Sequence, residues 1–199
     1  ASLSVKPGAL SDLSDRWILS RFNHTIAVVT ASLEAFRFDE ASRALYEFVW
    51  NDYCDWYVEL AKAKLNGGDS EARSQTQQIL SHVMNGILRM LHPMIPFISE
   101  ELWQQFPHEG DFLIAAPWPE PETGRYDDLA EAQMKVVQDV IGAVRNIRGT
   151  MNIPPGKKAD LVLRVECVEK RQYLEGVTGY ICELAKIENI QVGVDVERP

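Results

Sequence analysis

Apolar residues recur at three- and four-residue steps through much of the chain, which is the period of amphipathic α-helices. The first stripe follows a helix start at Ser11 or Ser14 and contains Leu19, Phe22, Ile26, Val29, Leu33 and Phe36. The second follows the N-cap Ser70, ends before Pro93, and contains Ile79, Val83, Ile87, Met90 and Leu91. A third, short helix that Pro107 ends is expected to be lined by Ile98, Leu102 and Phe106. Such helices with short connections predict a bundle.

The stretch 38–66 combines helical spacing with a high density of aromatic side chains, which are Phe48, Trp50, Tyr53, Trp56 and Tyr57. Asp39 and Asp55 are suitable N-caps, so the stretch predicts two helical pieces that meet near Cys54. Aromatic residues at such a joint most often pack in a core, because each one buries a large apolar area. The alternative is a platform on which nucleic-acid bases stack.

The pattern changes after the bundle helices. Residues 107–126 are rich in proline and predict an extended excursion laid over the bundle. A long helix then runs from the N-cap Asp127 to about Gly149, with helical apolar steps at Ala130, Met134, Val137, Ile141, Val144 and Ile147 or Arg148. Alternating residues predict strands in 159–166 and 190–196, with a helix over 169–187 that is interrupted at Gly176 or Gly179.

The chain is therefore expected to be mainly α-helical. A linker covers 1–10, a helical bundle covers 11–149, and a small α+β appendage covers 150–199. Because two strands alone are only marginally stable, the strands of the appendage must pack on its helices.

Composition places the chain among ordinary globular proteins. It has 199 residues, of which 46% are hydrophobic and 25% are charged. No apolar run approaches the ~20 residues that span a bilayer, so no membrane partner is expected. The three cysteines, Cys54, Cys167 and Cys182, are far apart and odd in number. This argues for a reducing, cytoplasmic compartment and against a disulfide framework or a zinc site.

Signals of catalysis are missing from the sequence. It contains no glycine-rich phosphate loop and no Gly-x-Ser-x-Gly motif, and its histidines lack metal-ligand spacing. Asp52, Asp55 and Glu59 lie on neighbouring turns and form a candidate pair of acids. The stronger interpretation is that these carboxylates cap helices and pair with Lys62 or Arg21. No catalytic residue, metal or cofactor is therefore assigned to this chain.

The overall charge argues against nucleic-acid binding, but a local basic face decides such binding. The net charge is −9 and the isoelectric point about 5.0. Arg21 lies about 200° around the first helix from Leu19, outside its core face. By itself such a residue is most often a solvated surface arginine.

Four segments resemble valyl-tRNA synthetases. They are WILSRF (17–22), FDEASRALYEFVWNDYCDWYVELAK (38–62), LHPMIPFISEELWQ (91–104) and VRNIRGTMNIPP (144–155). The first and third are similar to class I aminoacyl-tRNA synthetases for valine, isoleucine, leucine and methionine in general. The YCDWY run at 53–57 is more specific and points to the valine enzymes. The resemblance covers nearly the whole chain.

This resemblance implies that the chain is the anticodon-binding region of such an enzyme, with a helical bundle and a junction subdomain. Its partners would be a valine-accepting tRNA and the enzyme's catalytic domain, whose signatures do not occur here. The whole enzyme would use ATP and magnesium to activate valine and to esterify tRNA. Alone, the chain is not expected to be active.

The resemblance also implies site residues. The arginine of WILSR corresponds to Arg21, and a base-stacking tryptophan of the related methionine enzymes corresponds to Trp56. Unpaired anticodon bases are recognised by stacking and by hydrogen bonds to their edges. Further candidates for RNA contact are Asn51, Phe38, Arg43, Arg145 and Arg148, together with Lys157 and Lys158. The segment HPMIPF and the residues Glu100 to Trp103 are expected to be structural. Two alternatives stay open: the same region of the isoleucine or leucine enzyme, and a helical module that binds protein.

Overall fold

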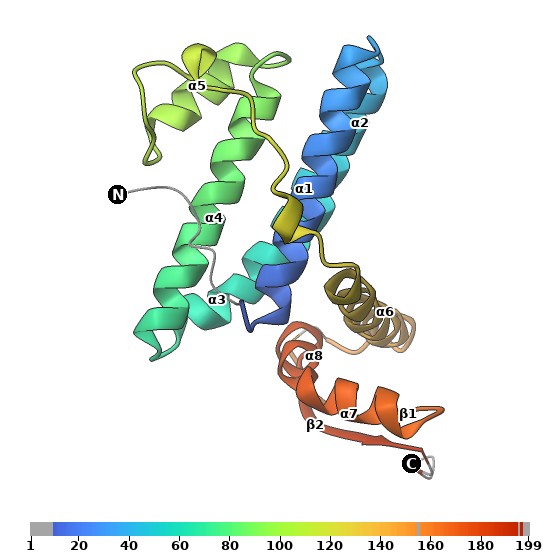
Figure 1. The fold of residues 1–199 in the computed structure, drawn as a ribbon. Coiled ribbons are helices and arrows are strands. Elements are labelled where there is room, and N and C mark those ends of the chain that lie inside the picture. The colour runs from blue at the N-terminus through green and yellow to red at the C-terminus, as the bar shows by residue number, and fades with distance from the viewer. Residues whose placement is uncertain (1–9, 155, 195, 197–199) are drawn as a thin grey trace. The chain divides into compact units, whose positions relative to one another are not determined.

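The computed structural model describes residues 10–154, 156–194 and 196. The chain divides into two compact units, Ala1–Glu131 and Ala132–Pro199. The expected linker falls almost wholly on residues 1–9, which lie outside the described part. The chain is mainly helical, with a small sheet in the second unit (Figure 1). The predicted fold class is thus confirmed.

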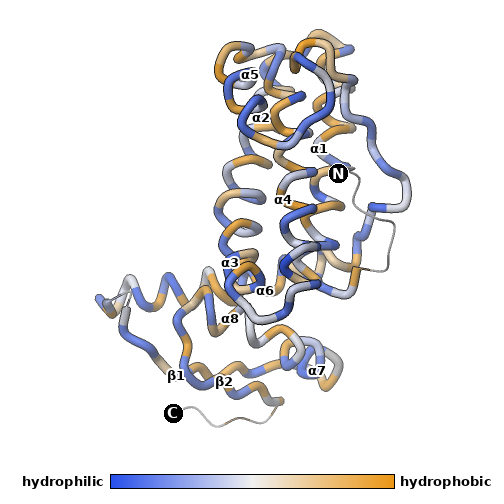
Figure 2. The backbone as a smooth tube through the Cα atoms, turned by 90° about the vertical axis from the view of Figure 1, so that its left-hand side faces the viewer, coloured by the Kyte–Doolittle hydropathy of each residue, from blue (hydrophilic) through white to orange (hydrophobic). Residues whose placement is uncertain are grey.

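The first unit is built on long helical segments that pack against one another (Figure 1). Helix α1 (Leu13–Glu34) contacts α2 (Phe38–Glu47) and α4 (Ser70–Leu91), and α3 (Glu59–Asn66) contacts α4. The stripe predicted for α1 is buried at Leu19, Phe22, Ile26 and Val29. Phe36 is exposed instead, because α1 ends before it. Figure 2 shows hydrophobic and hydrophilic positions alternating along these helices, as an amphipathic bundle requires.

The N-cap residues of the long helices α1 and α4 are aspartates, whereas serines were expected at these positions. Asp12 caps α1 by accepting a hydrogen bond from the backbone N–H of Asp15. Asp69 caps α4 by accepting from the N–H groups of Glu71 and Ala72. The prediction of a cap at Asp39 was wrong, because α2 already starts at Phe38 and Asp39 lies in its first turn.

The aromatic stretch contains no break. Between α2 and α3 the chain forms a π-helix, η1 (Phe48–Val58), so the helix passes through the predicted joint at Cys54 without a second N-cap at Asp55. Phe48, Tyr53 and Tyr57 are buried, whereas Asn51, Cys54 and Asp55 are exposed. π-helical segments are rare and occur frequently at functional sites.

Helix α5 (Pro96–Gln104) is short, as expected, but it ends before Phe106 and buries a different side from the one predicted. Trp103 is fully buried against Leu88 and Leu113, whereas Ile98 and Leu102 are exposed. The excursion after α5 is extended as predicted, with short 3-10 turns at Leu113–Ala115 and Thr123–Arg125. Trp118 fastens it to α1 by donating a 2.8 Å hydrogen bond to Thr30.

Helix α6 (Asp128–Thr150) begins in the first unit and continues into the second, with Asp127 accepting from the N–H of Ala130 at 2.8 Å. The second unit continues with β1 (Ala159–Arg164), α7 (Val168–Gly176), α8 (Thr178–Ala185) and β2 (Ile187–Gly193). The strands are parallel, which requires the α7–α8 crossover between them. The predicted interruption of the helix is confirmed. Strand β2 starts three residues earlier than predicted, directly after Lys186, whose φ of 55° ends α8.

No helix among the described residues is long and apolar enough to cross a membrane.

Candidate nucleic-acid interface

Arg21 is tied to two acidic side chains. Its Nε donates a 2.9 Å hydrogen bond to Asp52 on η1, and its Nη1 lies 3.3 Å from Glu131 at the start of α6. The Arg21 side chain remains 39% exposed, so the guanidinium is neither sealed inside nor fully solvated. Asp52, Asp55 and Glu59 were expected to pair with Lys62 or Arg21; in the structure Asp52 pairs with Arg21 and Glu59 pairs with Lys62. Arg21 thus lies outside the core face, as its helical position predicted, but the sequence did not show that two carboxylates balance its charge.

The charge balance at this cluster follows from burial and pairing together. Burial disfavours the Arg21 cation, but Asp52 and Glu131 more than compensate, so the pKa of Arg21 is raised. Burial also raises the pKa of Asp52, a shift that Arg21 opposes and that Glu131 and Glu47 reinforce. His24 adds a contact of 3.3 Å to Glu131. The cluster is thus a fixed array of donors and acceptors more than a positive patch.

Trp56 lies on η1, one turn after Asp52, and is partly exposed. Two buried tyrosines of η1 hold this segment in place. Tyr53 donates a 3.1 Å hydrogen bond to the carbonyl of Leu80 on α4, and Tyr57 donates a 2.9 Å hydrogen bond to Asp15 on α1. The π-helix is therefore fastened to both neighbouring helices on either side of Trp56. Such support keeps a side chain oriented for recognition.

A buried ion pair connects α3 to the start of α1. Lys64 of α3 lies 2.5 Å from Asp15, whose side chain is almost completely buried, and 2.9 Å from Asp12. Burial raises the pKa of Asp15, although Lys64 and Tyr57 act in the opposite direction. Sequence reasoning treated Asp15 only as an acid suited to the helix dipole. No local signal connects it to Lys64, 49 residues later.

The turn between α1 and α2 presents two exposed aromatic rings. Phe36 has a φ of 59°, a left-handed conformation that is unusual for a bulky residue. It is 79% exposed, and its ring lies edge-on to that of Phe38 at 6.3 Å. Phe38 was a predicted contact residue, and its exposure leaves it available for stacking. Strained backbone at an exposed site of this kind favours a functional interpretation.

Arg43 lies on the exposed side of α2. Within the described residues, no carboxylate pairs with it. Helical spacing places Tyr46 and Trp50 on the same side, where their rings are parallel within 4° and have centroids 6.4 Å apart. Asn51 follows Trp50 and is exposed. Sequence reasoning named Arg43 and Asn51 but missed this ring pair, which the spacing of Arg43, Tyr46 and Trp50 already indicates.

The predicted basic residues of the second unit bind its own backbone. Arg145 donates a 3.3 Å hydrogen bond to the carbonyl of Leu184. Arg148 is buried and donates to the carbonyls of Pro154, at 2.9 Å, and Lys157. Both arginines and Lys186 line one hollow of about 410 Å³. Lys158 lies 3.8 Å from Glu188 and is exposed.

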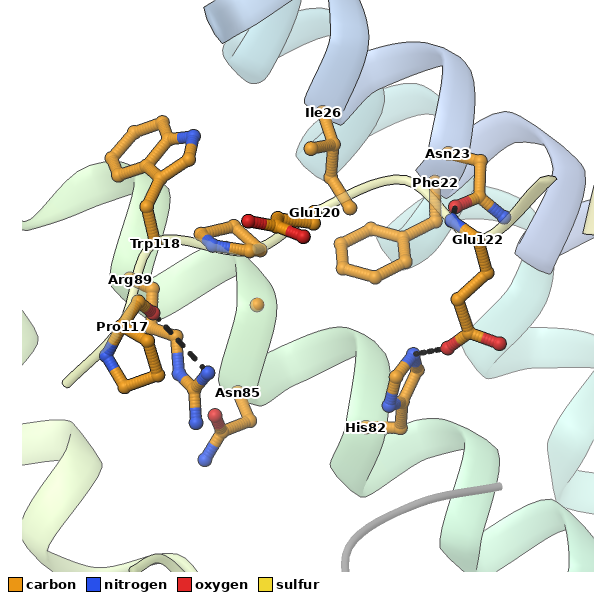
Figure 3. Close-up of a pocket in the computed structure, with 12 residues that line it drawn as sticks. Phe22, Asn23, Ile26, His82, Asn85, Arg89, Pro117, Trp118, Glu120 and Glu122 are labelled. Carbon is orange, nitrogen blue, oxygen red and sulfur yellow. Dashed lines mark hydrogen bonds and ion pairs between the residues drawn. The ribbon is translucent and has the colours of Figure 1, made fainter. Parts of the chain in front are cut away.

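A separate hollow of about 410 Å³ lies between α1, α4 and the extended excursion (Figure 3). His82 and Glu122 face each other in it at 3.9 Å, and Arg89 donates to the carbonyl of Pro117 at 3.3 Å. Phe22 forms part of its wall. None of the nine predicted RNA-contact residues lines this hollow, so it is not the predicted interface.

Comparison with known proteins agrees with the mainly helical fold and identifies the family. Residues 15–163, more than half of the chain, match the model of the anticodon-binding domain of tRNA ligase. Curated valine–tRNA ligases are similar to this chain over nearly all of its length. The chain is 40% identical to the valine–tRNA ligase of Bacillus licheniformis over 185 residues, a stretch that makes up 93% of the chain. The identity is 39% with the enzyme of Listeria innocua over 188 residues, and 38% with the enzyme of Enterococcus faecalis over 187 residues. Each of these two alignments covers 94% of the chain.

The chain spans about a fifth of these relatives, 21% of the length of each. The resemblance seen in the four sequence segments is confirmed over this length. Since the family model matches residues 15–163 and the fold is mainly helical, the chain belongs to the anticodon-binding domain family of tRNA ligases.

Proposed function

We propose that this chain binds the anticodon stem-loop of a valine-accepting tRNA and so contributes to its selection by a valine–tRNA ligase. The supporting observation is the arrangement of Trp56 and Arg21. Trp56 is partly exposed on a π-helix that two tyrosines hold in place, and Asp52, one turn earlier, binds Arg21. A base that leaves the anticodon stack meets an aromatic face beside oriented donors and acceptors.

The acidic surroundings of Arg21 define what this site recognises. A guanidinium between two carboxylates contributes little net positive charge, so it is poorly suited to a phosphate. Its remaining N–H groups and the oxygens of Asp52 and Glu131 instead suit the polar edge of a base. Base edges carry sequence information, whereas phosphate contacts fix position.

Phosphate contacts are assigned to other residues. Arg43 is exposed and lies beside the ring pair of Tyr46 and Trp50. In the second unit, the exposed Arg145 and Lys186 line one hollow, whereas Arg148, which is buried and bound to the carbonyls of Pro154 and Lys157, is not among the phosphate contacts. The exposed cations offer the electrostatic component that tRNA binding requires in a protein of net charge −9.

The activation of valine and its transfer to tRNA are assigned to parts of the ligase outside these residues. Among the described residues, no three His, Cys, Asp or Glu side chains form a metal site. The curated relatives are valine–tRNA ligases of which the matched stretch is about a fifth, so we expect ATP and magnesium to act in the remaining part of the ligase, while this chain positions the tRNA in the cytoplasm.

Titration of the chain with valine-accepting tRNA and with a non-cognate tRNA tests the proposal. We expect tighter binding of the cognate tRNA and a Kd that rises between about 50 mM and 200 mM salt. Equal and undetectable binding of both tRNAs would favour the alternative, a helical module that binds protein.

A further inference from the structure

The hollow between α1, α4 and the extended excursion takes no part in the proposed function, but it has the size and the lining of a small-molecule site. Its volume of about 410 Å³ falls within the roughly 300–1,000 Å³ that ligand pockets occupy. Its lining residues all belong to the first unit. The apolar part of the lining consists of Phe22 and Ile26 of α1 and Pro117, Trp118 and Pro119 of the excursion (Figure 3).

Helix α4 contributes two polar side chains with buried, unpartnered donors to this hollow. Asn85 is 5% exposed, and its Nδ2 has no hydrogen-bond partner among the described residues. The same holds for the buried Nε of Arg89, which lies one helical turn further along α4. Buried polar groups nearly always have a partner, so each exception calls for a specific explanation. Two such donors beside one hollow indicate a ligand that carries a hydrogen-bond acceptor.

The guanidinium of Arg89 has one edge that suits a carboxylate. Its Nη1 donates to the carbonyl of Pro117 at 3.3 Å, which leaves the edge formed by Nε and Nη2. Guanidinium and carboxylate groups form two parallel hydrogen bonds along such an edge. Burial lowers the pKa of Arg89, although Glu109 acts in the opposite direction, and no carboxylate of the described residues forms an ion pair with it. A carboxylate ligand would supply the missing counter-ion.

Two acids of the excursion determine the other end of the ligand. Glu122 pairs with Arg125 at 3.2 Å and faces His82 at 3.9 Å, so its charge is already balanced. Glu120 is exposed, and no cation of the described part of the chain pairs with it. Figure 3 shows Glu120 on the excursion side of the hollow and Arg89 on the α4 side. Glu120 would repel a simple carboxylate ligand, but it would attract one that also carries an ammonium group.

We infer that this hollow binds a zwitterionic amino acid with an apolar side chain. Its carboxylate pairs with Arg89 and accepts a hydrogen bond from Asn85, its ammonium group pairs with Glu120, and its side chain packs against Phe22 and Ile26. Such a ligand contacts α1, α4 and the excursion together. Its binding therefore stabilises the folded chain and fastens the excursion to the bundle.

Calorimetric titration of this chain with L-phenylalanine tests the inference, because an aromatic ring suits the apolar walls of the hollow. L-phenylalaninamide lacks the carboxylate, and N-acetyl-L-phenylalanine lacks the ammonium group. We expect L-phenylalanine to bind and to raise the midpoint of thermal unfolding, and each derivative to bind about tenfold more weakly or worse, because each loses a bond between charged groups. Absence of binding by L-phenylalanine, or equal affinity for the three compounds, would overturn the inference.

Three variants of the chain assign the contacts. Arg89→Gln should raise the Kd of L-phenylalanine about tenfold or more. Arg73→Gln is the matched control, since it makes the same charge change at an exposed residue of α4 outside the hollow, and it should leave the Kd unchanged. Glu120→Gln should remove the preference for L-phenylalanine over its N-acetyl derivative. Equal losses in the two arginine variants, or a preference that survives Glu120→Gln, would contradict the assignment. Neither Arg21 nor Trp56 lines the hollow, so the titration with tRNA stands or fails separately.

Discussion

Arg21 on α1 and Asp52 on η1 are joined by a 2.9 Å hydrogen bond between the guanidinium Nε and the carboxylate. This bond connects the first helix to the π-helix that carries Trp56. Only part of each side chain meets solvent, 39% for Arg21 and 17% for Asp52. The pair therefore experiences less screening than an exposed ion pair, and its contribution can be separated by mutation.

A double-mutant cycle with Arg21→Gln and Asp52→Asn should give a coupling of about 1 kcal/mol in the free energy of unfolding, measured with urea. Lys135 and Asp139 form the matched control, an i,i+4 pair at 2.5 Å that is 68% and 62% exposed. Its coupling should be about 0.3–0.5 kcal/mol, because solvent screens it. Equal couplings for the two pairs would show that partial burial of Arg21 has no energetic consequence.

Trp56→Ala should weaken binding of valine-accepting tRNA without unfolding the chain. One stacked base contributes roughly 1–3 kcal/mol, which corresponds to a Kd about 5- to 150-fold higher. Trp103→Ala is the contrasting variant. Trp103 is fully buried, and its truncation should cost about 3–5 kcal/mol of stability. Calorimetric titration and thermal unfolding of both variants check this. If Trp56→Ala melts the fold as Trp103→Ala does, Trp56 is a core residue and the stacking assignment is wrong.

Periodicity predicted the helices of the first unit because their buried residues repeat in helical steps. The π-helix was missed, although its signal is present: Phe48, Tyr53 and Tyr57 are buried at steps of five and four residues. A mixture of four- and five-residue steps is what the wide turn of an i→i+5 hydrogen-bond pattern produces. Interpreting Asp55 as an N-cap broke this helix in two.

The inner side of α5 could not be chosen from its sequence. Ile98, Leu102 and Trp103 lie on adjoining sides of the helix, and the contact of Trp103 with Leu88 and Leu113 decides between them. Of the candidate site, the sequence predicted Arg21 and Trp56 through the resemblance, and it offered Arg21 or Lys62 as the partner of Asp52, Asp55 and Glu59. It did not supply the contact with Glu131, because a residue 110 positions away gives no local pattern.

Asp15→Asn should change how stability depends on pH. Burial raises the folded-state pKa of Asp15 above its ordinary 3.8, so above that pH the folded state holds more protons than the unfolded chain. Asp15 therefore contributes stability that is present at low pH and is lost as the pH rises through the raised pKa. Asparagine keeps an oxygen for the hydroxyl of Tyr57 but does not titrate.

Urea denaturation at several pH values between about 4 and 7 measures this effect. The free energy of unfolding of the unmodified chain minus that of Asp15→Asn should decrease as the pH rises. Asp52 also has a raised pKa, but it is common to both proteins and cancels in the difference. A difference that stays constant or grows with pH would contradict the direction of the shift.

Gly86 and Gly142 are both helical glycines, and alanine should have opposite effects at the two positions. A Cβ at Gly86 of α4 would lie 2.2 Å from the ring of Phe22, which packs in the core between α1 and α4. Gly86→Ala should therefore destabilise the chain by about 1–3 kcal/mol through overpacking. A Cβ at Gly142 of α6 meets no atom within 4 Å, so Gly142→Ala should stabilise the chain by roughly 0.5–1 kcal/mol through helix propensity. Thermal unfolding of both variants checks the pair. A neutral Gly86→Ala would mean that Phe22 can move without cost and that its ring does not fix the spacing of the two helices.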